Sequence, residues 1–248
     1  MSMQWIAGIN PVAGALANDV ERVRELLVEQ GNRNARVQDL AAEARRLGVL
    51  VRQVSRAEIE RAVAGVRHQG IAAAYEAPAV RDEHDLVALA EGAGRGALFL
   101  VLDGVTDPHN LGACLRSAAA ANITAVIVPR DRAAGITPVA RRASAGGADR
   151  VPLVEVTNLS RALRALKDAG VWLVGLDGTG AGSIHDQDLV GPIALVLGGE
   201  GEGMRRLTRE TCDFVVRIPM PGPMESLNVS VATGIALFEA LRQRGVKA

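Results

Sequence analysis

The sequence predicts an α/β protein whose C-terminal part contains a parallel β-sheet. From residue 96 onward, short apolar runs alternate with helical stretches, which is the pattern of consecutive βαβ units. Hydrophobic residues make up 48% of the chain and aromatic residues only 2%, so the core has to be built from Ala, Val, Leu and Ile. This composition suits parallel strands that helices cover on both faces. At 248 residues the chain has room for two domains.

Residues 1–75 are expected to form a small α/β domain. Asn10 is a plausible N-cap for the first helix, because Pro11 follows at the first helical position. Gly31 and Gly48 each end a segment with a helical pattern of apolar residues. The expected elements are, in order, helices over 10–18, 19–31 and 37–48, a strand over 49–55, a helix over 56–65 and a strand over 70–75.

Residues 76–95 differ in composition from both flanking segments. They include Pro78, a Gly-Ala-Gly run and more acidic than basic residues. Part of this segment could be helical, but a connector is the simplest interpretation. The predicted organisation is therefore an N-terminal domain over 1–75, a linker over 76–95 and a second domain over 96–248.

The second domain shows the alternation of strands and helices most clearly. Strands are expected over 97–105, 123–129, 150–156, 171–178, 193–200 and 214–219. Helices are expected over 110–121, 158–170, 205–212 and 226–245. Ligands of open parallel sheets gather beyond the carboxyl ends of the strands, so the residues after each strand are the candidates for a site.

Composition excludes several classes of protein. The formal net charge is zero, so any nucleic-acid binding has to come from local patches. Cys114 and Cys212 lie far apart and no Cys/His cluster exists, so neither a disulfide framework nor a metal site is expected. No secretory signal and no apolar stretch of ~20 residues is apparent, which favours a soluble cytoplasmic protein that binds no membrane.

The first candidate site follows the strand over 97–105. Asn110 lies at the start of the next helix, and Arg116 follows six residues later. An asparagine amide can orient a polar substrate, and an arginine can bind phosphate through a forked contact. The alternative is that Asn110 only caps the helix and Arg116 is a solvated surface charge.

The second candidate site is the glycine-rich stretch after the strand over 193–200. Gly198 and its neighbouring glycines let a ligand or another backbone come close. The stretch matches neither the Walker pattern nor the dinucleotide-binding pattern of glycines. Glu200 also disfavours an anionic ligand, so a neutral or cationic ligand is expected.

The third candidate site is the segment 218–228, which begins with Ile218 and contains three prolines. Proline has no backbone N–H, so this segment is predicted to be a shaped loop rather than an interior strand. Small residues on the following helix permit close packing against another backbone. The alternative is an ordinary loop and a core helix capped by serine.

Together these stretches resemble a known family. "NLGACLRSA", "LVLGGEGEGM" and "IPMPGPMESLNVSVA", in this order, are similar to the three signature motifs of the SpoU-type RNA ribose methyltransferases of the SPOUT class. "GINPVAGAL" and "VSRAEIERAVAGVRHQGIAA" resemble the bacterial branch that methylates a guanosine 2′-hydroxyl in 23S ribosomal RNA. The resemblance implies a C-terminal domain with a deep trefoil knot, preceded by a ribosomal-protein-like α/β domain that binds RNA.

The resemblance also implies a cofactor and a set of site residues. The cofactor is S-adenosyl-L-methionine, contacted by main-chain atoms of Gly198, Ile218 and Leu227. Arg116 matches the residue to which the family assigns activation of the 2′-oxygen. The implied roles of the others are that Asn110 positions the RNA or holds Arg116, that Glu200 orients the helix or pairs with Arg116, and that Ser226 and Asn228 complete the substrate side.

Two other functions are compatible with the sequence. One is a non-catalytic RNA-binding or assembly factor built on this fold, which the zero net charge favours. The other keeps the chemistry but changes the substrate to transfer RNA or another ribosomal site. The resemblance further implies a homodimer, and an apolar stripe on the last helix, which includes Val231 and Phe238, would form its interface.

Overall fold

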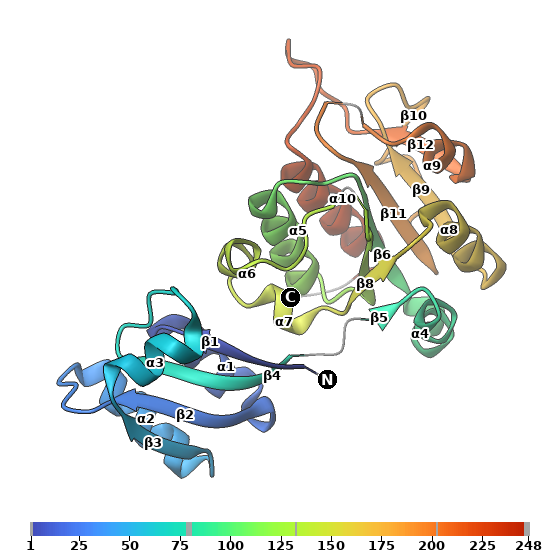
Figure 1. Ribbon diagram of the computed structural model, residues 1–248. Coiled ribbons are helices and arrows are strands. Elements are labelled where there is room, and N and C mark those ends of the chain that lie inside the picture. The colour runs from blue at the N-terminus through green and yellow to red at the C-terminus, as the bar shows by residue number, and fades with distance from the viewer. Residues whose placement is uncertain (1, 78–80, 132, 202, 246–248) are drawn as a thin grey trace. The chain divides into compact units, whose positions relative to one another are not determined.

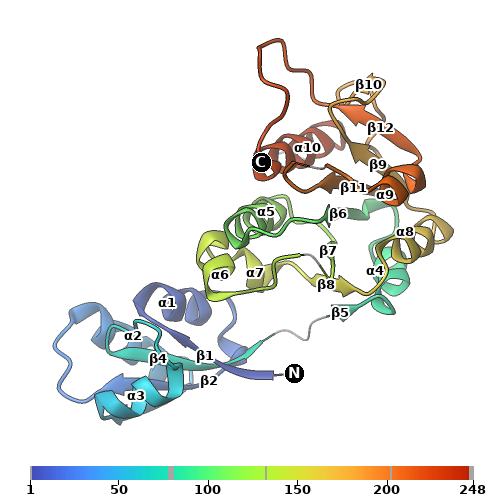
Figure 2. The ribbon, with the colours of Figure 1, turned by 45° about the horizontal axis from the view of Figure 1, so that its top comes forward.

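The computed structural model describes residues 2–77, 81–131, 133–201 and 203–245. The chain divides into two compact units, Met1–Ala79 and Val80–Ala248. Each unit has its own sheet and its own hydrophobic core (Figures 1 and 2).

The first unit is a four-stranded sheet with the order β1-β4-β2-β3, covered by helices on both faces. Strands β1 and β2 run antiparallel to β4, and β3 runs parallel to β2. Leu26 and Val28 pack with the residues of α1 and α2, whereas Leu27 packs with those of α3. The elements are β1 (Ser2–Ala7), α1 (Ile9–Asn18), η1 (Val20–Arg22), β2 (Val23–Glu29), α2 (Ala35–Arg46), β3 (Leu50–Val54), α3 (Arg56–Val63) and β4 (Ile71–Ala77).

Two expectations for this unit are wrong. Residues 19–31 form η1 and the interior strand β2 instead of a helix. This strand is buried on both faces, so its apolar residues do not alternate with polar ones. Together with the charged residues near its ends, they give the spacing of apolar residues that is typical of an amphipathic helix. Asn10 is inside α1 rather than its N-cap, which is Gly8. The side chain of Gln69 accepts the Ile9 N–H at 3.1 Å, so a distant segment satisfies the helix start.

The second unit contains an eight-stranded sheet with the order β10-β12-β9-β11-β6-β7-β8-β5, and its strand pairs are parallel. The six predicted strands are confirmed. The elements are β5 (Arg81–Asp82), α4 (Asp85–Ala93), η2 (Gly94–Gly96), β6 (Leu98–Asp103), α5 (Pro108–Ala120), β7 (Ala125–Pro129), α6 (Pro138–Ser144), α7 (Gly147–Arg150), β8 (Leu153–Val156), α8 (Leu159–Asp168), β9 (Trp172–Leu176), β10 (Gly182–Ser183), β11 (Ile193–Gly198), α9 (Arg206–Thr211), β12 (Phe214–Arg217) and α10 (Val229–Gln243).

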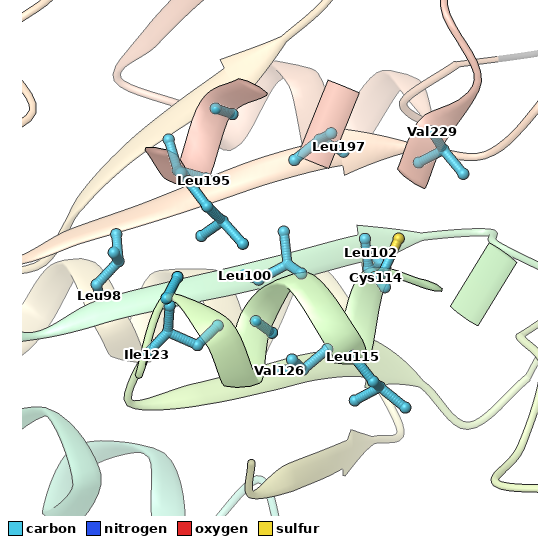
Figure 3. Packing of buried hydrophobic residues seen from close by; sticks show 14 of the residues in the cluster. Leu98, Leu100, Leu102, Cys114, Leu115, Ile123, Val126, Leu195, Leu197 and Val229 are labelled. Carbon is cyan, nitrogen blue, oxygen red and sulfur yellow. The ribbon is translucent and has the colours of Figure 1, made fainter. Parts of the chain in front are cut away.

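Helices cover both faces of this sheet. Leu98, Leu100 and Leu102 of β6 pack with residues of α5 and α10 on one face (Figure 3). Phe99 and Val101 pack with residues of α4 and α8 on the other face. Every residue of β6 is buried, as expected for a central parallel strand.

The expected connector over 76–95 is mostly part of the second unit. It contains β5 and helix α4, and α4 packs against α8. Leu86 and Ala90 of α4 are buried at helical spacing, whereas most of the acidic residues that suggested a connector precede this helix. Pro78 lies outside the described residues.

The C-terminal end of the last helix is held by the side chains of Gln243, which bonds to the main chain of Gln187 and Leu189, and of Arg244. The guanidinium of Arg244 donates hydrogen bonds to the carbonyl oxygens of Gly96 and Ala97, just before β6, at 2.9 and 3.2 Å. It also donates to the carbonyl oxygens of Leu189 and Gly191, which precede β11. This arginine therefore joins α10 to the amino ends of the two central strands.

Among the residues that the structure describes, no helix is long and apolar enough to cross a membrane. No group of three or more His, Cys, Asp or Glu side chains in the same residues is placed to hold a metal ion. Cys114 and Cys212 are both free thiols. Burial raises the pKa of the Cys114 thiol to about 11.

Candidate active site

A cavity of about 900 Å³ opens at the carboxyl ends of three neighbouring strands. Its wall comes mainly from residues 176–179 at the end of β9, residues 197–201 and 203 around the end of β11, and the segment 218–229 after β12. Its volume is within the range of small-molecule sites. The sheet therefore has a cavity of ligand size where parallel sheets bind their ligands.

Glycine is required where β11 meets the cavity. A Cβ atom at Gly198 would overlap the main chain of Gly203 and Met204, and one at Gly199 would overlap the carbonyl of Gly104. Gly199 and Gly203 also form a β-bridge, so the chain folds back on itself directly after the strand. This wall of the cavity therefore presents main-chain atoms rather than side chains.

Three polar side chains from the three candidate stretches meet at the edge of the cavity. Asn110 Nδ2 donates to Glu200 Oε1 at 2.5 Å. Asn228 Nδ2 donates both to Asn110 Oδ1 and to Glu200 Oε1, each at 3.0 Å. We call Asn110, Glu200 and Asn228 the polar triad. Its carboxylate accepts hydrogen bonds from two amides.

Helix starts position two members of the triad. Asp107 caps α5 by accepting the His109 N–H at 2.9 Å, which places Asn110 in the first turn. Asn110 is thus not the N-cap, which excludes the alternative reading of that residue. Asn228 is the N-cap of α10 and accepts the Ser230 N–H at 2.9 Å. The helix predicted to begin at residue 226 therefore begins at Val229.

Arg116 is apart from the triad. It is exposed on α5, and it has no hydrogen bond or ion pair among the described residues. Six residues of α-helix rotate a side chain by ~240° and advance it by ~9 Å, so Arg116 and Asn110 face different directions. The expectations that Glu200 pairs with Arg116 and that Asn110 holds Arg116 are therefore wrong for the single chain.

The remaining predicted residues line the cavity. Ser226 and Leu227 lie in the loop before α10, and both are exposed. Ile218 follows β12 and packs against the core of the unit. Gly198 ends β11. The structure thus brings together seven of the eight predicted residues, through the cavity wall and the triad.

Sequence reasoning missed an ion pair at the rim of the cavity. Arg209 Nη1 of α9 lies 2.7 Å from Asp177 Oδ2, just after β9. Burial opposes ionisation of Asp177, but hydrogen bonds from Thr179 and the ion pair with Arg209 outweigh it and lower its pKa. The place of Asp177 at the end of a predicted strand was a usable signal. No pattern in the sequence pointed to Arg209.

Comparison with known proteins agrees with this architecture. Residues 97–238 match the family described as "SpoU rRNA Methylase family". Residues 5–80 match the family described as "RNA 2'-O ribose methyltransferase substrate binding". These two matches cover most of both units.

Curated relatives align along nearly the whole chain. The protein named "23S rRNA (guanosine-2'-O-)-methyltransferase RlmB" of Xylella fastidiosa (strain 9a5c) is 56% identical over 241 residues, which are 97% of each chain. The protein of the same name from Photobacterium profundum is 50% identical over 246 residues, covering 99% of this chain and 100% of that protein.

Solved structures show the same fold. The SpoU methyltransferase AviRb from Streptomyces viridochromogenes, in complex with AdoMet, aligns with a TM-score of 0.76 at 28% identity, covering 98% of this chain and 90% of that one. An AdoMet-bound rRNA methyltransferase from Sinorhizobium meliloti aligns with a TM-score of 0.75 at 26% identity, covering 97% and 87%. From these matches, the chain belongs to the SpoU rRNA methylase family.

Proposed function

We propose that this protein transfers a methyl group from S-adenosyl-L-methionine to the ribose 2′-hydroxyl of a guanosine in 23S ribosomal RNA. The observation that carries the proposal is the meeting of Asn110, Glu200 and Asn228 beside a cavity walled by glycine main chain. The relatives that carry this activity in their names align with nearly every residue of the chain.

The cavity fits the proposed cofactor. Apolar side chains such as Leu197 and Ile218 suit an adenosine, and the glycine wall lets main-chain N–H and C=O groups reach it. Glu200 and Glu225 line the cavity and favour a positively charged ligand. When bound, S-adenosyl-L-methionine supplies a methyl group on a positively charged sulfur. We assign cofactor binding to the main chain of Gly198, Ile218 and Leu227.

We assign the polar triad the binding of the substrate ribose. A ribose 2′-hydroxyl is a poor nucleophile at neutral pH, so it needs orientation and polarisation by neighbouring groups. Asn110 and Asn228 supply amide groups at the edge of the cavity, held by Glu200, and Ser226 adds a hydroxyl on the same side. Arginine side chains donate hydrogen bonds and are not proton acceptors in proteins, so we assign Arg116 the binding of an RNA phosphate or of the 2′-oxygen rather than proton removal.

The test is transfer of a labelled methyl group to unmodified 23S ribosomal RNA, followed by mass mapping of the modified nucleotide. We expect label on one guanosine ribose and none on transfer RNA. Label on transfer RNA alone would move the substrate to that class. Tight RNA binding without transfer to any RNA would instead support a non-catalytic assembly factor.

We also propose that the protein acts as a homodimer through α10. Val231 and Phe238 lie seven residues apart on this helix, and their side chains are 50% and 52% exposed. Side chains seven residues apart share one face of a helix, so they form an apolar stripe beside the buried face that packs on the sheet. Leu227, at the cavity, is also exposed, which would place the interface next to the site.

The remaining proposals concern the two units. The first, including residues 1–75, is proposed to be a ribosomal-protein-like domain that binds the RNA, with catalysis in the second, including residues 96–248. We propose a trefoil knot around the loop 218–228. This loop starts at β12, which β9 and β11 separate from the central strand β6, and it leads to α10, which packs against α5. Since the substrate is ribosomal RNA, the protein is expected to work in the cytoplasm. Binding of ribosomal RNA by the isolated N-terminal fragment, in a gel-shift assay, tests the first assignment.

A further inference from the structure

The carboxylate of Asp103 is buried beneath the active site and is not used in the mechanism above. Asp103 ends β6, and its side chain is fully shielded from solvent. We infer that Asp103, with Arg205, is a positioning residue that fixes the place of Glu200 and of the glycine wall. This inference rests on the proposed function, because it names what these two residues do for that site.

Asp103 holds both ends of the glycine-rich turn that contains Glu200. At the start of the turn, its main-chain oxygen accepts the Gly199 N–H at 2.8 Å. At the end of the turn, its carboxylate accepts the Arg205 N–H at 2.9 Å and Arg205 Nε at 2.5 Å, and it forms an ion pair with the same guanidinium. One residue of the central strand therefore fixes both the entry to and the exit from the turn.

Packing leaves the turn little freedom between these two points. The bridge between Gly199 and Gly203 closes it, and Gly199 lies against the carbonyl of Gly104. Glu200 directly follows Gly199, so the position of its carboxylate is set relative to β6. Asn110 and Asn228 both donate to that carboxylate, and hydrogen bonds of 2.5–3.0 Å tolerate little displacement. Movement of the turn would therefore disturb the triad and the cavity wall together.

A purely structural role makes a different prediction, and the chain offers a matched control. Asp213 has the same kind of contacts: it accepts the Leu173 N–H at 2.9 Å and pairs with Lys167 Nζ at 2.7 Å. Its side chain is also mostly buried, at 15% exposure. It lies near the amino ends of β9 and β12, at the edge of the sheet opposite the cavity. Loss of either carboxylate should destabilise the unit, but only Asp103 contacts the turn.

The experiment compares Asp103→Asn with Asp213→Asn in the full-length protein. An asparagine at either position keeps one acceptor oxygen and replaces the other with an NH₂ group that faces donors. The readouts are the melting temperature, amide hydrogen exchange of the segment 199–205, the Kd of S-adenosyl-L-methionine measured without RNA, and kcat for methyl transfer. Exchange and cofactor binding need no RNA, so they report on the inference even if the proposed RNA substrate is wrong.

Both variants are expected to melt at a lower temperature. Only Asp103→Asn should speed exchange of the segment 199–205, raise the cofactor Kd by about tenfold and lower kcat by about 100-fold, the scale of a displacement of about 1 Å at a reacting group. Equal effects of both variants on exchange and on Kd would overturn the inference.

A second pair of variants keeps the test decisive if Asp103→Asn does not fold. Arg205→Ala removes the guanidinium but keeps the main-chain N–H that donates to Asp103. Lys167→Ala likewise removes the ammonium group that pairs with Asp213 but keeps the Leu173 N–H that donates to it. Faster exchange of the segment 199–205 and weaker cofactor binding are expected for Arg205→Ala alone. An Arg205→Ala protein that binds the cofactor as tightly as Lys167→Ala would contradict the inference, whereas partial recovery in Arg205→Lys would support it.

Discussion

Replacement of Asn228 by alanine removes two contributions at once. The side chain caps α10 through the Ser230 N–H, and loss of an N-cap costs about 1 kcal/mol of the free energy of unfolding. It also donates to Asn110 and Glu200, and loss of a partly exposed hydrogen bond to a carboxylate costs about 1–2 kcal/mol more. We therefore expect Asn228→Ala to lower the free energy of unfolding by about 2–3 kcal/mol and to reduce methyl transfer strongly.

Asn158→Ala is the matched control for the cap alone. Asn158 caps α8 in the same unit by accepting the Arg161 N–H at 3.0 Å, and it does not line the cavity. In urea unfolding, Asn158→Ala should lose only about 1 kcal/mol and should keep its activity. Asn228→Ser, which retains a capping oxygen but not the amide donors, should be more stable than Asn228→Ala and equally poor in methyl transfer. If Asn228→Ala loses no more stability than Asn158→Ala and transfers methyl groups normally, the polar triad has no role in the reaction.

Three further outcomes are expected. Arg116→Ala should abolish methyl transfer while calorimetry finds cofactor binding nearly unchanged; an equal loss of both would refute the assigned role. Phe238→Asp should place a charge in the apolar interface and give monomers or aggregates in sedimentation, with weaker cofactor binding; a monomeric, fully active unaltered protein would exclude the dimer. Hydrogen bonds from Arg242 and Gln243 lower the pKa of Glu239 to about 2. Its contribution to the free energy of unfolding is therefore complete above the pKa of the unfolded state and is lost as the pH falls towards 2. In Glu239→Gln the free energy of unfolding should depend less on pH between about pH 4.5 and 2, and an unchanged pH dependence would contradict this.

The sequence predicted the second unit better than the first, and burial explains why. The strands around β6 are covered on both faces, so they appear as short, uninterrupted apolar runs between turn residues. β2 is an interior strand too, but charged residues at its ends mix with its apolar ones, and the mixture imitates an amphipathic helix. Helix α4 is short, so its two buried positions, Leu86 and Ala90, were too few to indicate packing against the sheet.

For the site, the sequence could predict which residues gather but not which of them touch. The ends of parallel strands meet at one edge, so position indicated the stretches that contain Gly198, Glu200 and Ile218, and the family resemblance singled out these residues. The partner of Glu200 depends on the direction in which α5 presents each side chain, and that direction is set by packing against α6 and α10. The Asp103–Arg205 pair joins residues 102 positions apart and leaves no pattern in the chain.

The long-range contacts of α10 determine when the site can form during synthesis on the ribosome. Asn228 reaches back 118 residues to Asn110, and Arg244 reaches back 148 residues to Gly96. A nascent chain that has emerged only as far as β12 contains all the central strands. It still lacks the cavity wall from the loop 218–228, the triad member Asn228 and helix α10. The cavity wall and the polar triad therefore cannot be complete until the loop 218–228 and α10 have left the exit tunnel, so a chain that has emerged only as far as β12 has no complete site.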